Sequence, residues 1–124
     1  MKLHAIRENH LYSKAYSKGK RAVTPALAVY ILPDYTAEAL RRANPQKIRI
    51  NRVGLTVSKK LGGAVVRNRV KRILREAYRA VEKQKGIKTG FLIVIAARER
   101  AVDKKTPEIT DELSSALSKL SMLL

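Results

Sequence analysis

Cysteine is absent from the 124 residues, which excludes disulfide bonds, thiol catalysis and zinc sites built on cysteine. Long hydrophobic runs are missing too. The two longest, Ala26–Leu32 and Phe91–Ala97, have seven residues each, against the roughly 20 that a membrane-spanning helix needs. The N-terminus lacks the apolar segment of a signal peptide. The sequence therefore predicts a soluble, cytoplasmic protein without a membrane partner.

Residues that could carry catalysis are also scarce. The two histidines, His4 and His10, are six positions apart, and helical geometry would not place them on one face. A metal site built from them and a carboxylate is therefore disfavoured. Glu76 is the one acid in the basic middle of the chain and is expected to pair with a neighbouring arginine. Gly62-Gly63 is not followed by the Gly-Lys-Ser/Thr of a phosphate-binding loop. We predict no catalytic residue and no metal ligand.

Acidic residues are few: 10 Asp and Glu face 27 Lys and Arg, which gives a net charge of +17. The excess is concentrated in Arg52–Arg79, which holds nine cations and one acid. A surface of this charge favours a polyanionic partner. Nucleic acid is the first expectation, and an anionic membrane is a distant second because no aromatic-rich amphipathic anchor is present.

This basic stretch contains a predicted strand and a predicted helix. Val53, Leu55 and Val57 alternate with smaller residues, which indicates a half-buried strand. Gly62-Gly63 then breaks the pattern, and a helical period begins. The apolar arc of this helix is expected to consist of Val66, Val70, Ile73, Leu74, Ala77, Ala80 and Val81. The opposite, basic arc is expected to consist of Arg67, Asn68, Lys71, Arg72, Arg75 and Arg79. Arg67 lies in the first turn, where free backbone N–H groups suit a phosphate.

Two interpretations of the basic arc compete. Charged residues commonly fill the solvated side of a helix, and the arc then serves only solubility. Acids are almost missing here, however, so pairs four residues apart cannot offset the repulsion among the cations. Such an arc destabilises the isolated helix, which favours binding to nucleic acid.

The remaining elements follow from apolar spacing and from glycine and proline. Gly19 suits a left-handed position after the first helix. Thr36–Ala43, inside a 33–51 connection, is expected to form one or two helical turns. Residues 99–124 sum to a charge of −1, so the last helix is expected to pack against the core. The predicted elements are the helices His10–Lys18 and Thr106–Leu124 and the strands Lys20–Thr24, Ala26–Leu32 and Phe91–Ala97. The prediction is one α+β domain, 1–124, with a four-stranded sheet and three helices in the order α-β-β-β-α-β-α.

Three tyrosines allow two interpretations each. Tyr12 and Tyr16 are four residues apart on the first helix, and Tyr30 lies in a strand. Their spacing favours packing in the core. Tyrosine beside basic residues is also how proteins stack single-stranded bases, so both interpretations stay open at this point.

The run SKKLGGAVVRNRVKRILREAYR, centred on Arg67-Asn68-Arg69, resembles the signature of the protein subunit of bacterial ribonuclease P. Weaker resemblance extends over nearly the whole chain and includes Tyr12, Tyr16, Gly19 and Tyr30. The resemblance implies a ribosomal-protein-like two-layer sandwich. It also implies a left-handed β-α-β crossover through the basic helix, against the usual hand of such units.

The resemblance implies a ribonucleoprotein endonuclease, a hydrolase in which a large RNA is the catalyst. That RNA uses Mg²⁺ to remove the 5′ leader from precursor tRNA, and the protein, monomeric alone, binds no cofactor itself. The residues implied to bind the catalytic RNA are Lys59, Lys60, Arg67, Asn68, Arg69, Lys71, Arg72 and Arg75. Tyr12, Tyr16 and Tyr30 are implied to line a cleft for the leader, close to the helix that carries Asn68.

Arg69 lies apart from the other residues of this set, because it points about 200° from Arg67 on a helix. It either packs its stem or meets a different RNA strand. Two other classes of function remain open for the chain: a ribosomal or other structural RNA-binding protein, and a nuclease active without RNA.

Overall fold

The computed structural model describes residues 4–6, 9–34 and 51–124. The helical turns predicted within Thr36–Ala43 lie outside these residues. Among the helices described, none is long and apolar enough to cross a membrane.

One mixed sheet organises the fold, with the strand order β1-β4-β5-β3-β2. The strands are β1 (His4–Ala5), β2 (Lys20–Val23), β3 (Leu27–Pro33), β4 (Arg52–Thr56) and β5 (Phe91–Ala97). β4 runs parallel to β1 and β5, whereas β3 is antiparallel to β2 and β5. The four predicted strands are confirmed, and the two-residue strand β1 extends the sheet beyond them.

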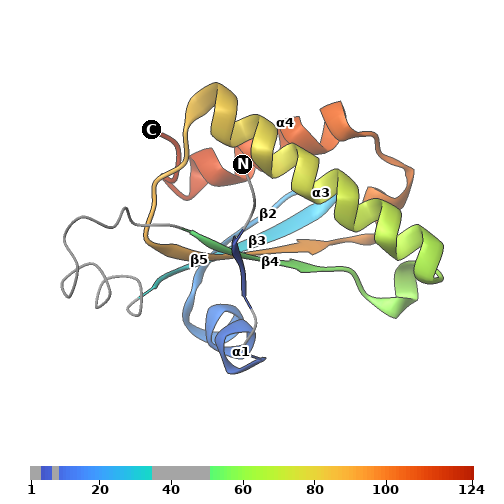
Figure 1. The fold of residues 1–124 in the computed structure, drawn as a ribbon, viewed down its shortest axis with the longest axis horizontal. Coiled ribbons are helices and arrows are strands. Elements are labelled where there is room, and N and C mark those ends of the chain that lie inside the picture. Colours follow the sequence, from blue (N-terminus) through green and yellow to red (C-terminus); the bar gives the residue numbers. More distant parts are fainter. Residues whose placement is uncertain (1–3, 7–8, 35–50) are drawn as a thin grey trace.

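The helices cover the two faces of the sheet unequally (Figure 1). α3 (Ala64–Lys85) and α4 (Thr106–Lys119) pack on one face, and α1 (Asn9–Lys18) lies on the other. Short 3₁₀ helices, η1 (Lys59–Leu61) and η2 (Glu99–Asp103), precede α3 and α4. The predicted order of helices and strands is confirmed. α3 connects the parallel neighbours β4 and β5, and the hand of this crossover stays a prediction.

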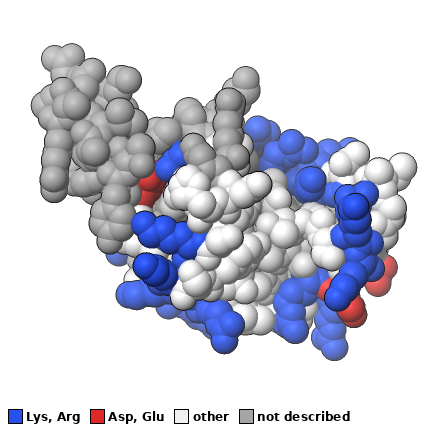
Figure 2. Space-filling view, turned by 90° about the horizontal axis from the view of Figure 1, so that it is seen from below, with Lys and Arg blue, Asp and Glu red and all other residues white. Residues whose placement is uncertain are grey.

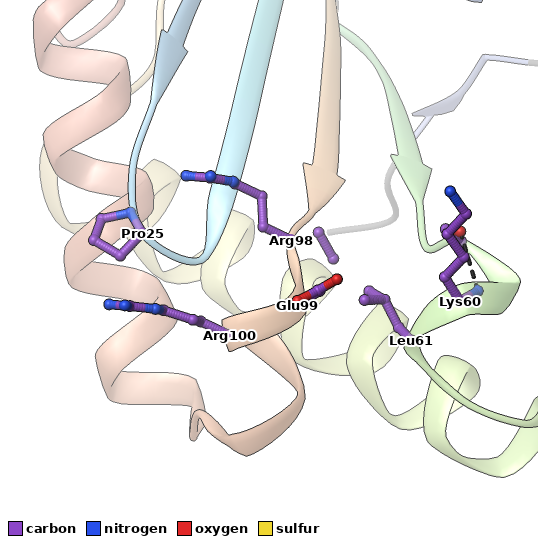
Figure 3. A pocket seen from close by; sticks show the side chains of 8 residues that line it. Pro25, Lys60, Leu61, Arg98, Glu99 and Arg100 are labelled. Atoms are coloured by element: carbon purple, nitrogen blue, oxygen red, sulfur yellow. Dashed lines mark hydrogen bonds between the residues drawn. The ribbon is translucent and has the colours of Figure 1, made fainter.

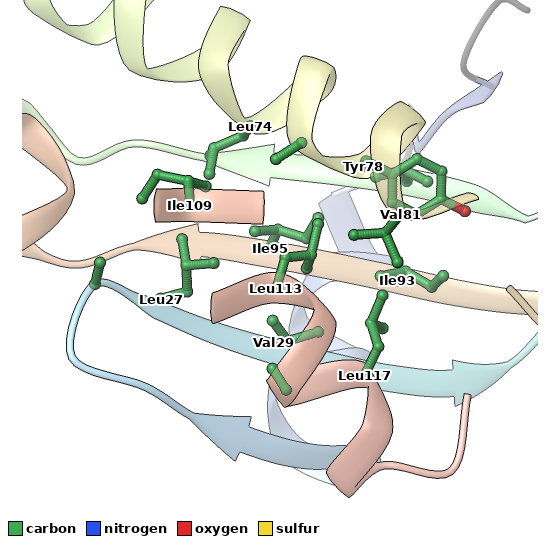
Figure 4. Close-up of a cluster of buried hydrophobic side chains, with 14 of the residues drawn as sticks. Leu27, Val29, Leu74, Tyr78, Val81, Ile93, Ile95, Ile109, Leu113 and Leu117 are labelled. Atoms are coloured by element: carbon green, nitrogen blue, oxygen red, sulfur yellow. The ribbon is translucent and has the colours of Figure 1, made fainter. Parts of the chain in front are cut away.

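The main core lies between the sheet, α3 and α4 (Figure 4). Its largest buried side chains include Leu27, Ile93 and Ile95 of the sheet, Leu74, Tyr78 and Val81 of α3, and Ile109, Leu113 and Leu117 of α4. The apolar arc predicted for the basic helix faces this core except at Ala80, which is half-buried and lies outside it. Tyr78, which that arc omitted, is buried in the core. The basic arc is thereby left on the outer side of α3.

Two details of the helix ends differ from the sequence prediction. Gly19 has no left-handed backbone; instead, a Cβ atom there would lie 2.5 Å from the Ala15 carbonyl oxygen and 2.7 Å from that of Ile31. Glycine is needed at this position for close backbone approach. The last helix ends at Lys119 rather than at the terminus, and Leu123 then forms a β-bridge with Ile87.

A buried polar network ties the start of β4 to α3 and β5. The Asn51 side-chain amide donates to the Tyr78 hydroxyl oxygen at 3.2 Å and to the Lys88 carbonyl at 2.8 Å. Its oxygen accepts from the Phe91 N–H at 3.0 Å. Desolvation raises the pKa of Tyr78 to about 12, although the bond from Asn51 acts in the opposite direction. The fold therefore holds this phenol in its protonated form.

Tyr78 is expected to make the fold sensitive to alkaline pH. Because the pKa of Tyr78 in the folded protein exceeds the ordinary tyrosine value of 10.0, its contribution to stability is complete below pH 10 and is lost as the pH rises towards 12. A shift of two pH units corresponds to about 2–3 kcal/mol of unfolding free energy. Urea unfolding at pH 8, 10 and 11.5 measures the loss. Tyr78→Phe removes the titrating group and should flatten this part of the profile; an unchanged profile in that variant would contradict the assignment.

Candidate nucleic-acid interface

The outer side of α3 presents the predicted basic arc to solvent. Arg72 and Arg75 are exposed, and Arg67 and Lys71 are half-buried. Within the described residues, Arg67, Lys71 and Arg75 form no salt bridge, and Arg72 meets Glu76 only at 4.0 Å. Glu76 thus has the expected arginine partner, and it also accepts a hydrogen bond of 3.1 Å from the Thr106 hydroxyl. The arc retains an uncompensated positive charge.

Arg67 adds a buried donor at the start of the helix. Its Nε atom is buried and has no hydrogen-bond partner among the described residues. Gly63 supplies no side-chain cap to α3, and the first turn contains no acid. A buried donor without an acceptor costs about 1–3 kcal/mol, and uncapped N–H groups carry partial positive charge. An anion at the helix N-terminus would satisfy the uncapped N–H groups and would be attracted by the positive charge of Arg67.

Arg69 lies away from the arc and contacts the protein itself. Its Nη1 atom donates to the Val102 carbonyl at 2.9 Å. This bond joins α3 to η2 through the guanidinium, while Arg69 itself is exposed. Packing of its stem stays a prediction, as does its assignment to RNA binding. Arg52 likewise forms a bidentate pair with buried Asp34, at 2.7 and 3.0 Å, and is structural.

Lys59 and Lys60 lie in η1, directly before α3, and both are exposed. The Ser58 hydroxyl caps this short helix by accepting from the Lys60 N–H at 3.1 Å. The two lysines therefore extend the positive surface from the start of α3 towards the end of β4.

The three tyrosines come together on the opposite face of the sheet. Tyr16 and Tyr30 meet edge to face, with ring centroids 4.8 Å apart and an interplanar angle of 85°. The Tyr16 hydroxyl lies 3.0 Å from the Thr56 hydroxyl. Tyr12 donates to the Ile6 carbonyl at 3.5 Å, and burial, with Tyr16 nearby, raises the pKa of its phenol. Tyr12 and Tyr30 are half-buried, whereas Tyr16 is 41% exposed. The two half-buried rings pack against a second, smaller core cluster that consists of Ile6, Ala15, Leu32, Leu92 and Val94.

Beside these rings, small residues of the strands form a flat part of the sheet surface, here called the floor. The sequence alone did not lead us to predict it. A Cβ atom on Gly54 would lie 2.5 Å from Cε1 of Tyr12, so the ring rests directly on the backbone of β4. Farther along, Thr56, Ala96 and Ala28 stand side by side in three adjacent strands. Figure 2 shows the pale centre of this face with Lys and Arg side chains gathered around it. The alternation of Gly54 and Thr56 with the apolar residues of β4 was the available signal.

The tyrosines and the basic arc do not share a face. α1 and α3 cover opposite sides of the sheet (Figure 1), although the sequence analysis expected the tyrosines close to the helix that carries Asn68. The segment that leads from one face to the other is the end of β4 with η1. No group of three or more His, Asp or Glu in the described residues could hold a metal ion.

Fold and surface define a small, basic α+β protein in which Arg67, Lys71 and Arg75 of the basic arc have no acidic partner among the described residues. Such a surface is typical of RNA-binding proteins. A family model described as Ribonuclease P matches residues 1–121. The ribonuclease P protein component of Alkaliphilus oremlandii is 34% identical over 121 residues, 98% of this chain and 94% of that protein. That of Clostridium acetobutylicum is 33% identical over 124 residues, 100% of this chain and 94% of that protein. The chain therefore belongs to the ribonuclease P protein family.

Solved structures agree with this assignment. The Staphylococcus aureus RNase P protein has a TM-score of 0.77 and 29% identity, covering 99% of this chain and 100% of that chain. The Thermotoga maritima RNase P protein has a TM-score of 0.72 at 21% identity, covering 94% of this chain and 96% of that chain. At 21% identity, the likeness to the Thermotoga maritima protein shows a shared fold and nothing more.

Proposed function

We propose that the chain is the RNA-positioning subunit of ribonuclease P and that an RNA carries out the cleavage. The observation that carries this proposal is the basic arc of α3, where Arg67, Lys71 and Arg75 have no acidic partner in the described residues. With Lys59 and Lys60 in η1, the arc would bind the backbone of the catalytic RNA through its phosphates and shape. Contacts to about six phosphates would give a log–log salt slope near −4 to −5.

The tyrosines would bind the 5′ leader of precursor tRNA. Tyr16 is exposed enough to stack on a base, and its edge-to-face contact with Tyr30 holds the two rings in place. Two or three stacked bases contribute about 1–3 kcal/mol each, which is enough to strengthen substrate binding by orders of magnitude without a catalytic residue. The Mg²⁺ expected in the holoenzyme would then belong to the RNA. The protein would act in the cytoplasm and be monomeric when free.

Reconstitution tests this function. The purified protein, added to a bacterial ribonuclease P RNA, is expected to lower the magnesium concentration needed to mature a precursor tRNA. The protein alone is expected not to cut the precursor, because the catalyst is proposed to be the RNA. If the RNA were indifferent to the protein while still binding it, the proposal would fail. Ribosomal RNA as the dominant co-purified species would favour a structural RNA-binding protein instead.

A further inference from the structure

A hollow of about 490 Å³ lies where the parallel strands β4 and β5 end, next to the part of the positive surface that η1 forms. Three separate segments line it: the β2–β3 turn at Pro25, the stretch Ser58–Leu61 before α3, and Ala97–Arg100 after β5. Its volume is within the range of small-molecule sites. The hollow is thus large enough to hold one nucleotide unit.

The lining of this hollow is cationic on two sides. Figure 3 shows Arg98 and Arg100 extending on one side towards Pro25, and Lys60 standing on the other side. Glu99 is the single acid among the lining residues, so three cations face one carboxylate. An anionic group between the two sides would be attracted by cations from both.

Arg98 is held in a fixed position at the wall. Its backbone N–H donates to the Ala26 carbonyl at 2.8 Å, and its Nη1 atom donates to the Thr24 carbonyl at 2.7 Å. A guanidinium has five N–H donors, so this anchoring leaves others for a ligand. Planar donors of this kind match phosphate oxygens.

The hollow continues the small-residue floor beside the tyrosines. Ala28 and Ala96 are paired across β3 and β5, and Thr56 stands next to Ala96. Just beyond the ends of β5 and β3, the Arg98 N–H donates to the Ala26 carbonyl, although the Ala26 side chain belongs to the main core. Residues two apart in a strand share a face and are about 6.6 Å apart. An extended RNA strand that lies on Tyr16 and Tyr30 would therefore pass over Thr56, Ala96 and Ala28 and reach the hollow.

We propose that this hollow binds a backbone phosphate of single-stranded RNA, at a leader nucleotide beyond those stacked on the tyrosines. The inference rests on the proposed function and extends it to a second contact on the same strand. Arg98 and Arg100 would donate to the phosphodiester oxygens from one side, and Lys60, at the edge of the surface proposed for the catalytic RNA, would add positive charge from the other. Glu99 would oppose binding.

Paired charge variants test the hollow, with the reconstituted holoenzyme and precursors of long or short leader as probes. Arg100→Ala is expected to weaken binding of the long-leader precursor about three- to fivefold, as suits an exposed charge pair. Glu99→Gln is expected to strengthen it about twofold. Both should leave the short-leader precursor and mature tRNA unchanged. The charge-matched controls are Lys119→Ala and Asp111→Asn, two exposed positions on α4.

Neutral methylphosphonate linkages, placed one at a time along the leader, locate the contact. At one position the neutral linkage should weaken binding to the unaltered protein and abolish the further effect of Arg100→Ala. The inference is overturned if the Arg100 and Glu99 variants match their controls, or if they affect mature tRNA equally. In those cases the proposed leader site at the tyrosines still stands, provided that Tyr16→Ala weakens binding of the precursor more than binding of mature tRNA. If Tyr16→Ala weakened both equally, the proposed function would fail as well.

Discussion

Replacing Arg67 and Lys71 together by alanine is expected to weaken binding to ribonuclease P RNA by about 10- to 100-fold. Each side chain has no acidic partner in the described residues, so each is free to neutralise a phosphate. A hydrogen bond to a charged group contributes about 1.5–3 kcal/mol at most, and partial exposure reduces that value. Two lost contacts should also lower the log–log salt slope by about 1.8. Filter binding between 50 and 400 mM salt measures both quantities.

The control for this variant removes the same charge elsewhere. Lys83→Ala with Lys119→Ala changes two exposed cations, and Lys83 is about 24 Å from Arg67 along α3. Circular dichroism should show both double variants folded, because neither touches the buried arc of α3. If the control weakened RNA binding as much as the Arg67 and Lys71 variant, net charge and not the arc would determine affinity.

Tyr16→Ala is expected to weaken binding of a precursor with its leader about 10- to 100-fold, while mature tRNA binds as before. The change removes a ring that is 41% exposed and also the edge contact that holds Tyr30 in place. Stacking of a base on an aromatic side chain contributes about 1–3 kcal/mol. Equilibrium binding of both RNAs to the holoenzyme gives the ratio that reports on leader recognition.

Tyr16→Phe separates the ring from its hydroxyl. It keeps the stacking surface and loses only the contact with Thr56, so most of the leader preference should remain. Equal losses for precursor and mature tRNA in the alanine variant would show that Tyr16 supports the fold and does not contact the leader.

Sequence periodicity was sufficient to predict α3 and the sides it presents. The period of Val70, Ile73 and Leu74 fixes which side is buried, because apolar side chains must leave water. The cations of the opposite arc are then necessarily outside. The same reasoning predicted the main strands, since β3 and β5 are short apolar runs.

Contacts between distant segments could not be predicted in this way. Periodicity does not show that Gly54 lies beneath Tyr12, that Arg69 reaches the Val102 carbonyl, or that Arg98 anchors to the β2–β3 turn. Each depends on strand register and on how the helices cross the sheet. The interpretation of Gly19 failed for a related reason: glycine serves both positive φ and close backbone approach, and only the packed structure distinguishes them.

The placement of α1 and α3 on opposite faces has a mechanical consequence for the proposed complex. β3 and β5 pair over seven residues without interruption, so the layer between the two helices is stiff. If each face holds a different RNA, the ribozyme and the leader are kept at a constant separation, set by one sheet and a helix about 10 Å thick. The polypeptide would then act as a rigid spacer between two nucleic acids and would require no hinge.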